Sequence, residues 1–564
     1  MSSNFLKLEE NLHMKMKTSD FIIQALENEG VEYIFGLPGE ENLDLLESIR
    51  KSDQIKLILT RHEQGAGFMA ATYGRLTGKS GVCMSTLGPG ATNLMTPAAY
   101  AQLGAMPMVM LTGQKPIKES KQGKFQIVDI LEMMQPLTKF SKQITYGKNS
   151  GAIIREAFRL SQEERPGGVH IEIPEDVCKE EVAKPHFFNI VHSKIPSANL
   201  ASISNAEKMI SAAKKPLLLI GASANRKRAS EALTKFVNTL KIPFFNTQMG
   251  KGIIDERNEL YLGTAALSSN DFIHEAIEEA DLIINVGHDT IEKPPFIMDA
   301  NDKRKVIHIN FFAAEINEVY FPQLNVIGDI AYSIEKLINE LKPCAGQWNT
   351  DFYLNVKKNV ANHLSKYEED NRFPILPQRL VKITRDILKD EDIVTLDNGI
   401  YKIWFSRNYP AYAQNTLLLD NALATMGAGF ASAIMAKELY PNKKVVSVNG
   451  DGGFMMNSQE LETAIRMQLD LVVIILNDNA YGMIEWKQEG EGFPKYGLEY
   501  QNPDFIKYAE SFGAHGYRPK SVKDFQDIFE KTLNTKGVHV IDLAVDYSLN
   551  HKILNVLLKE KTKN

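Results

Sequence analysis

The stretch GDGGFMMNSQELETAIRMQLDLVVIILNDNAYGM, residues 450–483, decides the fold of the C-terminal part of the chain. Apolar runs at 445–448 and 471–476 predict two buried strands on either side of an amphipathic helix. Asp451 and Asp478 follow these two strands. Because parallel strands present their carboxyl ends at one crevice, both carboxylates are expected in a single ligand site. Hard oxygen ligands beside unhindered glycine amides suit a Mg²⁺–diphosphate group, whereas two solvated acids would not explain the Gly-Asp-Gly-Gly turn.

This stretch resembles the signature of the thiamine-diphosphate enzymes, in which GDG, a spacer and an Asn/Asp-rich strand end hold the cofactor and its metal. The resemblance implies that Asp451 and Asp478 are Mg²⁺ ligands, with the main-chain carbonyl of Ala480 as a third. The signature usually ends in two asparagines, whereas this chain has Asn477-Asp478. An aspartate still ligates Mg²⁺, so the departure leaves the metal assignment in place.

Composition and charge narrow the class of protein. A chain of 564 residues is too long to fold around a single hydrophobic core, so several domains are expected. Its content of 44% hydrophobic and 24% charged residues is ordinary for globular domains. A net charge of −6 argues against nucleic acid as a partner. Cys83, Cys178 and Cys344 are too widely spaced for a metal motif or a disulfide framework and indicate buried thiols in a reducing cytosol. No apolar run approaches the roughly 20 residues that span a bilayer, and residues 1–16 lack a signal-peptide core, so we expect a cytoplasmic enzyme without a membrane partner.

Strand and helix patterns alternate along the chain. Short apolar runs such as 33–35, 216–220 and 393–396 are each followed by amphipathic segments, and a Pro-containing stretch at 182–201 indicates a linker. We therefore predict an α/β fold with three doubly wound parallel-sheet domains. Three such units again resemble the thiamine-diphosphate enzymes, which implies the following segments: an N-terminal extension (1–16), a pyrimidine-binding domain (17–185), a middle domain (202–345), a diphosphate-binding domain (372–550) and a C-terminal tail (551–564). In that family the cofactor binds between the first domain of one subunit and the third of another, so a homodimer or homotetramer with active sites at the subunit interface is implied.

Glu63 is the strongest catalytic candidate. It lies in Thr60-Arg-His-Glu-Gln-Gly-Ala66, which follows an apolar run and opens a helix rich in small residues. An acid in the first helical turn is favoured by the helix dipole, so the position alone does not indicate catalysis. In the family, however, the counterpart of Glu63 bonds a pyrimidine nitrogen of thiamine and helps form the imino tautomer that deprotonates the thiazolium. The resemblance therefore implies that Glu63 binds and activates the cofactor.

Further segments match cofactor-binding loops of the family. In 422–429, Met426 matches the bulky apolar residue that wedges beneath the thiazolium, although a methionine is otherwise most often core filler. The remaining cofactor-binding residues that the resemblance implies are Pro38, Gly39, Pro89, Asn93, Asn398, Gly399, Ile400, Tyr401, Gly450, Gly452, Gly453, Tyr481, Gly482 and Met483. Glu40 and Glu41 follow Gly39, where relatives carry small residues or a lysine, and we interpret these acids as a helix N-terminus.

Within the family, the nearest resemblance is to acetolactate synthase. The chain resembles the catabolic type, which feeds acetoin formation, more than the type that serves branched-chain amino acid biosynthesis. It is carried by 394–399 with Ile403-Trp404 and by 287–292. The implied reaction condenses two pyruvate molecules to 2-acetolactate and CO₂ through a hydroxyethyl-thiamine diphosphate enamine. Gln114 or Gln126 is then expected to donate a hydrogen bond to the acceptor's developing alkoxide.

The acceptor side has a second candidate in Lys487. The biosynthetic enzymes carry a tryptophan at this position to favour 2-ketobutyrate, whereas here Trp486 comes one residue early. The substitution favours pyruvate as the acceptor, with Lys487 placed to meet a carboxylate.

Other functions share these motifs. A flavin-dependent pyruvate oxidase, another 2-oxo-acid carboligase or an acyl-CoA lyase would carry the same cofactor residues. FAD stays open as a further cofactor, although Gly221-Ala-Ser-Ala224 lacks the dense glycines that an adenine dinucleotide favours. A non-catalytic cofactor-binding subunit would be expected to lack the activating carboxylate, which Glu63 supplies here.

Overall fold

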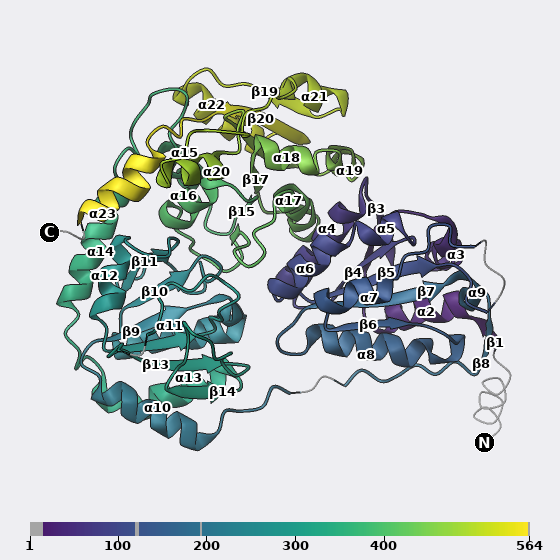
Figure 1. Cartoon of the computed structure of the whole chain (residues 1–564), viewed down its shortest axis with the longest axis horizontal. Coiled ribbons are helices and arrows are strands. Elements are labelled where there is room, and N and C mark those ends of the chain that lie inside the picture. The colour runs from purple at the N-terminus through teal and green to yellow at the C-terminus, as the bar shows by residue number, and fades with distance from the viewer. Residues whose placement is uncertain (1–14, 119–122, 192–193, 300, 562–564) are drawn as a thin grey trace. The chain divides into compact units, whose positions relative to one another are not determined.

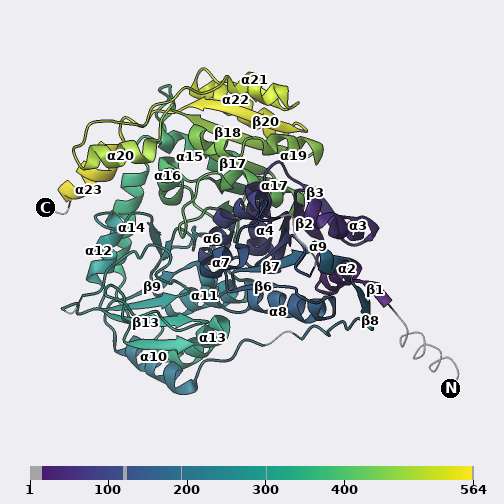
Figure 2. The ribbon, with the colours of Figure 1, turned by 45° about the vertical axis from the view of Figure 1, so that its right-hand side comes forward.

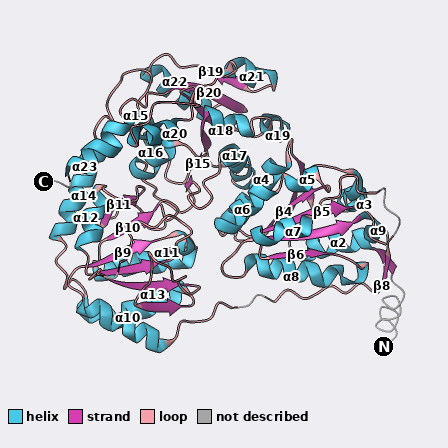
Figure 3. Cartoon of the chain, viewed as in Figure 1, coloured by secondary structure: helices cyan, strands magenta, loops and turns pink. Residues whose placement is uncertain are grey.

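The computed structural model describes residues 15–118, 123–191, 194–299 and 301–561, so most of the expected N-terminal extension lies outside the described residues. Within them, three six-stranded parallel sheets are each flanked by helices (Figure 3). Inner strands such as β9, β12 and β18 are buried and largely apolar, as expected when helices cover both faces of a parallel sheet, whereas the edge strands β3, β6, β14 and β19 are partly exposed. The predicted α/β fold with three doubly wound sheets is confirmed.

The first sheet has the strand order β3-β2-β4-β5-β7-β6, and a short antiparallel pair, β1 with β8, lies apart from it (Figure 1). The last two residues of β8 overlap the start of the stretch predicted to be a linker. The elements are β1 (Lys15–Lys17), α2 (Thr18–Asn28), β2 (Tyr33–Gly36), η1 (Glu40–Asn42), α3 (Leu43–Lys51), β3 (Lys56–Leu59), α4 (Glu63–Thr77), β4 (Gly81–Ser85), α5 (Pro89–Thr92), α6 (Met95–Leu103), β5 (Met108–Gln114), α7 (Ile130–Met134), η2 (Gln135–Leu137), β6 (Phe140–Gln143), η3 (Gly147–Asn149), α8 (Ser150–Gln162), β7 (Gly168–Pro174), α9 (Glu175–Cys178) and β8 (Glu181–Ala183).

The second sheet has the order β11-β10-β9-β12-β13-β14, so the chain reverses direction across the sheet between β9 and β12. Side-chain caps define several helix starts here; Asp329, for example, accepts the N–H of Tyr332 at the start of α13. The elements are α10 (Leu200–Ala212), β9 (Pro216–Ile220), η4 (Ala222–Ala224), α11 (Lys227–Leu240), β10 (Phe244–Thr247), β11 (Tyr261–Ala265), α12 (Phe272–Glu279), β12 (Leu282–Val286), β13 (Lys305–Asn310), β14 (Leu324–Ile327), α13 (Ile330–Leu341), η5 (Lys342–Cys344) and α14 (Asp351–Leu364).

The third sheet has the order β16-β15-β17-β18-β20-β19, and Figure 2 shows β17, β18 and β20 side by side. Its strand order, counted within the sheet, is the same as that of the first sheet. The elements are α15 (Pro377–Ile387), β15 (Ile393–Leu396), α16 (Ile400–Asn408), β16 (Leu417–Leu418), α17 (Ala428–Leu439), β17 (Val445–Gly450), α18 (Asp451–Met456), α19 (Glu460–Arg466), β18 (Leu471–Asn477), α20 (Gly482–Gly490), α21 (Phe505–Ser511), β19 (His515–Tyr517), α22 (Val522–Leu533), β20 (Val538–Ala544), η6 (Lys552–Val556) and α23 (Leu557–Lys561).

The described chain forms two compact units. The first contains the residues up to 191 together with Ile434–Leu439 and Gln459–Met467, and the second contains the middle and third sheets. Within the second unit, Arg407 on α16 donates two hydrogen bonds of 2.8 Å to Asp271, which caps α12. Both side chains are almost fully buried, so this ion pair joins the layers of the two sheets.

Two smaller features complete the fold. Cys83 and Cys178 are buried as expected, whereas Cys344 is only partly buried. Among the residues that the structure describes, no helix combines the length and apolar character that crossing a membrane requires.

Candidate active site

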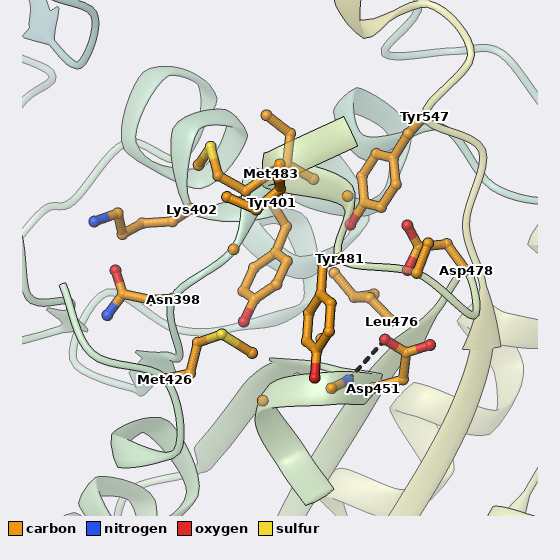
Figure 4. Close-up of a pocket in the computed structure, with 18 of the residues that line it drawn as sticks. Asn398, Tyr401, Lys402, Met426, Asp451, Leu476, Asp478, Tyr481, Met483 and Tyr547 are labelled. Atoms are coloured by element: carbon orange, nitrogen blue, oxygen red, sulfur yellow. Dashed lines mark hydrogen bonds between the residues drawn. The ribbon is translucent and has the colours of Figure 1, made fainter. Parts of the chain in front are cut away.

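The cavity at the carboxyl end of the third sheet gathers the residues of the opening motif. Strands β17 and β18 are parallel neighbours, with Gly450 opposite Leu476, so Asp451 and Asp478 follow adjacent strand ends as expected. The cavity has a volume of about 260 Å³ and is shown in Figure 4. It is lined by every residue that the sequence placed in the diphosphate half of the site: Asn398, Gly399, Ile400, Tyr401, Met426, Gly450, Asp451, Gly452, Gly453, Asp478, Ala480, Tyr481, Gly482 and Met483.

The two acids create a strongly anionic end of this cavity. Burial, together with the nearby carboxylates of Asp451 and Glu485, raises the pKa of Asp478 to about 7. Asp451 is 1% exposed and accepts hydrogen bonds from the backbone amides of Asn479 (2.8 Å) and Gly452 (2.7 Å). Two buried carboxylates at one place require a cation to be stable together in the ionised form.

Tyr500 is a residue of this centre that the sequence did not indicate. Its hydroxyl donates to the Asp451 carboxylate at 2.7 Å and lies 3.2 Å from the Ala480 carbonyl oxygen, so it contacts two of the three expected metal ligands. The Asn502 side chain also donates to Asp451, at 2.7 Å. Tyr500 follows Glu499, which forms an isolated antiparallel bridge with Ala480, so the chain returns to the motif only about twenty residues later and the motif alone does not reveal Tyr500.

The donor set and the space fit a magnesium–diphosphate group. Two carboxylates and a carbonyl are the hard oxygen ligands that Mg²⁺ takes, and Mg²⁺ completes its shell with phosphate oxygens and water. A Cβ at Gly452 would lie 2.7 Å from the Tyr500 hydroxyl, and one at Gly482 would lie 2.8 Å from an Asp478 oxygen. A side chain at either position would displace the Tyr500 hydroxyl or the Asp478 carboxylate, so glycine after each acid keeps these groups where they are.

The opposite wall of the cavity is held in place by Asp397, which the sequence analysis did not single out. Its carboxylate accepts the backbone N–H groups of Gly427 (3.0 Å), Ala428 (3.1 Å) and Gly429 (3.2 Å), directly after Met426. Asp397 is fully buried, and burial raises its pKa to about 6 although these amides act in the opposite direction. The carboxylate thereby anchors the start of α17 and the loop that presents Met426.

In the first unit, Glu63 begins helix α4. It is 9% exposed, and its Oε2 accepts a hydrogen bond of 2.9 Å from the Asn93 amide. A Cβ at Gly90 would lie 3.1 Å from the other oxygen of Glu63, so the loop after β4 closes tightly over the carboxylate. Pro89 opens the helix α5 that carries this loop, and a Cβ at Gly39 would collide with Thr86 in the same loop. The structure therefore brings together the residues expected in the pyrimidine half of the site.

A second buried carboxylate supports the backbone ahead of Glu63. Glu460, which belongs to the same unit, accepts the amides of Arg61 (3.1 Å) and His62 (3.0 Å) and the hydroxyl of Thr463 (2.6 Å). It is 0% exposed, and burial raises its pKa. Glu460 lies in the opening motif, but its partners lie about four hundred residues earlier, so sequence spacing could not reveal the contact.

The structure bears on three expectations about the first unit. Gln114 is buried, and its side-chain amide donates a hydrogen bond of 2.9 Å to the Glu172 carboxylate. Because this donor is already used inside the domain, we do not propose Gln114 as the alkoxide donor. Gln126 is exposed, and its main chain lies against Gly88 in the loop before Pro89. Glu40 and Glu41 open η1, as interpreted, and Glu41 is in addition buried, where it forms a 2.6 Å ion pair with Lys115.

Lys487 lies on α20 in the second unit. It is exposed, its ammonium lies 4.5 Å from the centre of the Trp486 ring, and it lines a second cavity of about 350 Å³. Trp486 itself is buried and donates to Asn555 at 2.6 Å, so it packs in the core and leaves the open position to the lysine.

Comparison with known protein families agrees with this geometry. Residues 16–133 match the N-terminal TPP binding domain of the thiamine pyrophosphate enzymes, 203–337 match their central domain, and 397–543 match their C-terminal TPP binding domain. The chain therefore belongs to the thiamine pyrophosphate enzymes and depends on thiamine diphosphate.

Relatives with assigned names place it further within this class. It is 32% identical to "Acetolactate synthase" of Bacillus subtilis (strain 168), over 96% of this chain and 95% of that protein. It is 34% identical to "Probable acetolactate synthase large subunit" of Methanococcus aeolicus, with 94% and 92% covered, and 30% identical to "Acetolactate synthase, catabolic" of Raoultella terrigena, with 96% and 97% covered. The chain is thus a carboligating enzyme of the acetolactate synthase group.

Proposed function

We propose that this enzyme is an acetolactate synthase that condenses two pyruvate molecules to 2-acetolactate and CO₂. The observation that carries the proposal is the cavity in which Asp451 and Asp478 face a wall formed by Met426, in a chain related to named acetolactate synthases over nearly its whole length. We propose the acetoin-forming role over the biosynthetic one, in line with the resemblance carried by residues 394–399 and 287–292, and a relative named as catabolic is 30% identical.

The metal end of the cavity would hold Mg²⁺ through Asp451, Asp478 and the Ala480 carbonyl. Diphosphate oxygens would complete the metal shell. The cation would also relieve the repulsion that raises the pKa of Asp478.

Glu63 is the proposed acid–base group. When bound, thiamine diphosphate supplies the nucleophilic carbon and the electron sink for decarboxylation. Glu63 would hold a proton at the pyrimidine ring nitrogen, and the Asn93 amide fixes the orientation of its carboxylate. Its nearly complete burial excludes water from that proton, as general acid–base catalysis requires.

The acceptor side is proposed to use Gln126 and Lys487. Both side chains are exposed in a single chain and are free to contact a substrate or a second subunit. Gln126 would donate to the developing alkoxide, and Lys487 adds positive charge for a substrate carboxylate. Exposed Tyr481 and Ile484 border the cofactor cavity and support a homodimer or homotetramer that covers them.

A flavin does not fit the middle domain. Dinucleotides bind where strand order reverses, which here is between the ends of β9 and β12. The loops after these strands are bonded directly to each other, since the Ser223 amide donates to the Gly287 carbonyl at 2.8 Å. A Cβ at Gly221 would lie 2.3 Å from the His288 Cα, and His288 is buried. We therefore propose a flavin-free enzyme, which disfavours a pyruvate oxidase; a flavin absorption band in the purified protein would contradict this.

The test is pyruvate turnover with thiamine diphosphate and Mg²⁺, with products separated as acetolactate, acetaldehyde and acetyl phosphate. Acetolactate is expected as the main product, and acetaldehyde as the main product would refute carboligation. Glu63→Gln should bind the cofactor but lose at least about 100-fold in turnover, the usual effect of removing a general acid–base. Glu175→Gln, an acid in the first turn of another helix of the same unit, is the control and should remain active.

The metal assignment is tested separately with Asp451→Ala. We expect Mg²⁺-dependent binding of thiamine diphosphate to weaken at least about 100-fold in calorimetric titration, because one of two anionic ligands is removed. Unchanged affinity would show that the metal binds elsewhere.

A further inference from the structure

A buried lysine without a carboxylate partner borders the cofactor cavity. Lys402 on α16 is 5% exposed, and its ammonium donates to the Asp420 carbonyl (2.9 Å) and to the Asn421 side-chain oxygen (3.2 Å). Across the described part of the chain, no carboxylate lies within ion-pair distance of it. A buried cation that has only neutral hydrogen-bond partners is unfavourable until an anion binds beside it.

Burial lowers the pKa of Lys402, while the more distant carboxylates of Asp420, Glu292 and Asp397 act in the opposite direction and favour the charged form. None of these three carboxylates forms an ion pair with the ammonium in the described part of the chain, so its remaining donor capacity is open to a ligand. The two neutral acceptors fix its position, so little side-chain freedom is lost when a ligand binds.

Lys402 also lines the second cavity, of about 350 Å³, which shares Met483 with the cofactor cavity. The charged residues of its wall are Lys293, Lys402, Lys487 and Lys559, with no aspartate or glutamate among the lining residues, and we call it the lysine pocket. The four lysines make this pocket positively charged although the whole chain has a net charge of −6, and a positively charged pocket attracts anions. Lys293 and Lys487 are exposed, so Lys402 is the buried cation between this pocket and the cofactor cavity.

The order of groups along the cofactor cavity gives the ligand's orientation. Figure 4 shows Asp451 and Asp478 at one end, Met426 further along, and the Lys402 ammonium beyond Met426 and Asn398 at the other end. A cofactor with its diphosphate at the acids and its reactive ring over Met426 would have its substrate on the Lys402 side. This step rests on the proposed function.

We propose that Lys402 binds the carboxylate of the acceptor, a small 2-oxo acid. By doing so it would make the enzyme prefer a charged acceptor over an uncharged one for the two-carbon unit that comes from the donor. The donor is excluded by chemistry: its carboxylate leaves as CO₂, and a cation bound to it would stabilise the reactant and slow that step. The acceptor keeps its carboxylate in the product, so a fixed cation can hold it through the whole addition.

The test is a competition between acceptors. Wild type, Lys402→Met and Lys402→Arg receive pyruvate as the donor, with isotope-labelled acetaldehyde added as an uncharged rival acceptor. We expect Lys402→Met to lower the ratio of acetolactate to labelled acetoin at least about tenfold, as for the loss of one charge-assisted contact. Lys402→Arg keeps the charge and should remain within about threefold of wild type, and Lys523→Met, an exposed lysine paired with Asp527 on α22, is the control for losing a lysine.

Calorimetric binding of thiamine diphosphate with Mg²⁺ verifies that Lys402→Met is folded; if it is not, Lys402→Gln, which keeps a donor without the charge, takes its place. A folded, active, charge-free variant with the wild-type product ratio overturns the role of Lys402 and leaves the proposed function standing. A wild-type enzyme that makes neither acetolactate nor acetoin overturns the proposed function, and this inference with it.

Discussion

Replacing Asp397 by alanine tests whether a single buried carboxylate holds the wall of the cofactor cavity. In the structure this side chain accepts three consecutive amides, from Gly427, Ala428 and Gly429. Alanine removes every one of these acceptors at once, at a position that water does not reach. The loop that presents Met426 would lose its anchor, although no residue that contacts the cofactor has been changed.

The expected magnitude follows from the three bonds. A buried donor left without a partner costs about 1–3 kcal/mol, so three donors set a lower limit of about 3 kcal/mol for the local stability of this segment. Since each 1.4 kcal/mol is a factor of ten, opening of the segment should become more than about 100-fold more frequent. Strands β15 and β18 should be unaffected, because their ladder hydrogen bonds do not involve the Asp397 side chain.

Hydrogen exchange read by mass spectrometry gives the measurement. Peptides that cover 425–431 should exchange more than about 100-fold faster in Asp397→Ala, whereas peptides from β18 should match wild type. Asp386→Ala, an exposed acid on α15 paired with Lys382, is the control and should leave both regions unchanged. Exchange of 425–431 within twofold of wild type in Asp397→Ala would refute the anchoring role.

Asp397→Asn adds a pH dependence to this prediction. The folded pKa of about 6 lies above the ordinary 3.8, so protonation favours the folded state. This contribution is fully present below the ordinary pKa and is lost as the pH rises through 6, and it amounts to about 3 kcal/mol. Asparagine does not titrate, so between about pH 3 and pH 7 wild type should lose about 3 kcal/mol relative to Asp397→Asn in thermal unfolding. Parallel pH profiles of the two proteins would contradict this.

Three further changes probe the same framework. Glu460→Gln keeps the shape but weakens the charge-assisted bonds to the amides ahead of α4, so thermal unfolding should show a loss of about 1–2 kcal/mol and turnover should fall; an unchanged enzyme would show that the contact is dispensable. Tyr500→Phe removes a hydroxyl that competes with the metal for Asp451, so Mg²⁺ should bind about fivefold more tightly in calorimetry, and weaker binding would mean that the hydroxyl orients the acid. Arg407→Met leaves Asp271 buried and unpaired and should cost about 3–5 kcal/mol in urea unfolding. Burial acts to raise the pKa of Asp271, but the Arg407 charge holds that pKa below its ordinary value. In wild type the ion pair therefore stabilises the fold at pH above the ordinary pKa, and this stabilisation is lost as the pH falls. The variant should not show this loss.

Much of the fold could be predicted because a parallel strand buried on both faces is a continuous apolar run. The runs at 216–220, 393–396 and 471–476 are strands with those or nearly those bounds. The adjacency of Asp451 and Asp478 could be predicted for the same reason, since strand ends in a parallel sheet meet at one edge. Strand β8 was missed because three residues carry too little pattern to distinguish a strand from a linker.

The supporting carboxylates could not be predicted, because their partners are distant in sequence and are backbone groups. Asp397 binds amides thirty residues later, and Glu460 binds amides about four hundred residues earlier. Neither contact leaves a mark on side-chain spacing, since any residue supplies an N–H. The ion pair of Glu41 could not be predicted for a related reason: an acid at a helix start is usually solvated, and only the structure shows Lys115 beside it.

The two ends of the cofactor cavity differ in how they depend on sequence. The proposed metal end is formed mainly by two strand ends and the glycines after them, which lie in one continuous stretch of sequence, so a contiguous motif describes most of it. The far end is formed by a side chain of α16 that points past Asn398 toward the loop at 420–421. Helix α16 is buried around nearly all of its surface, so periodicity does not separate Lys402 from the core residues beside it. A single substitution at this end changes the charge offered to the acceptor without disturbing the metal site, and acceptor choice can therefore change while the cofactor chemistry is kept.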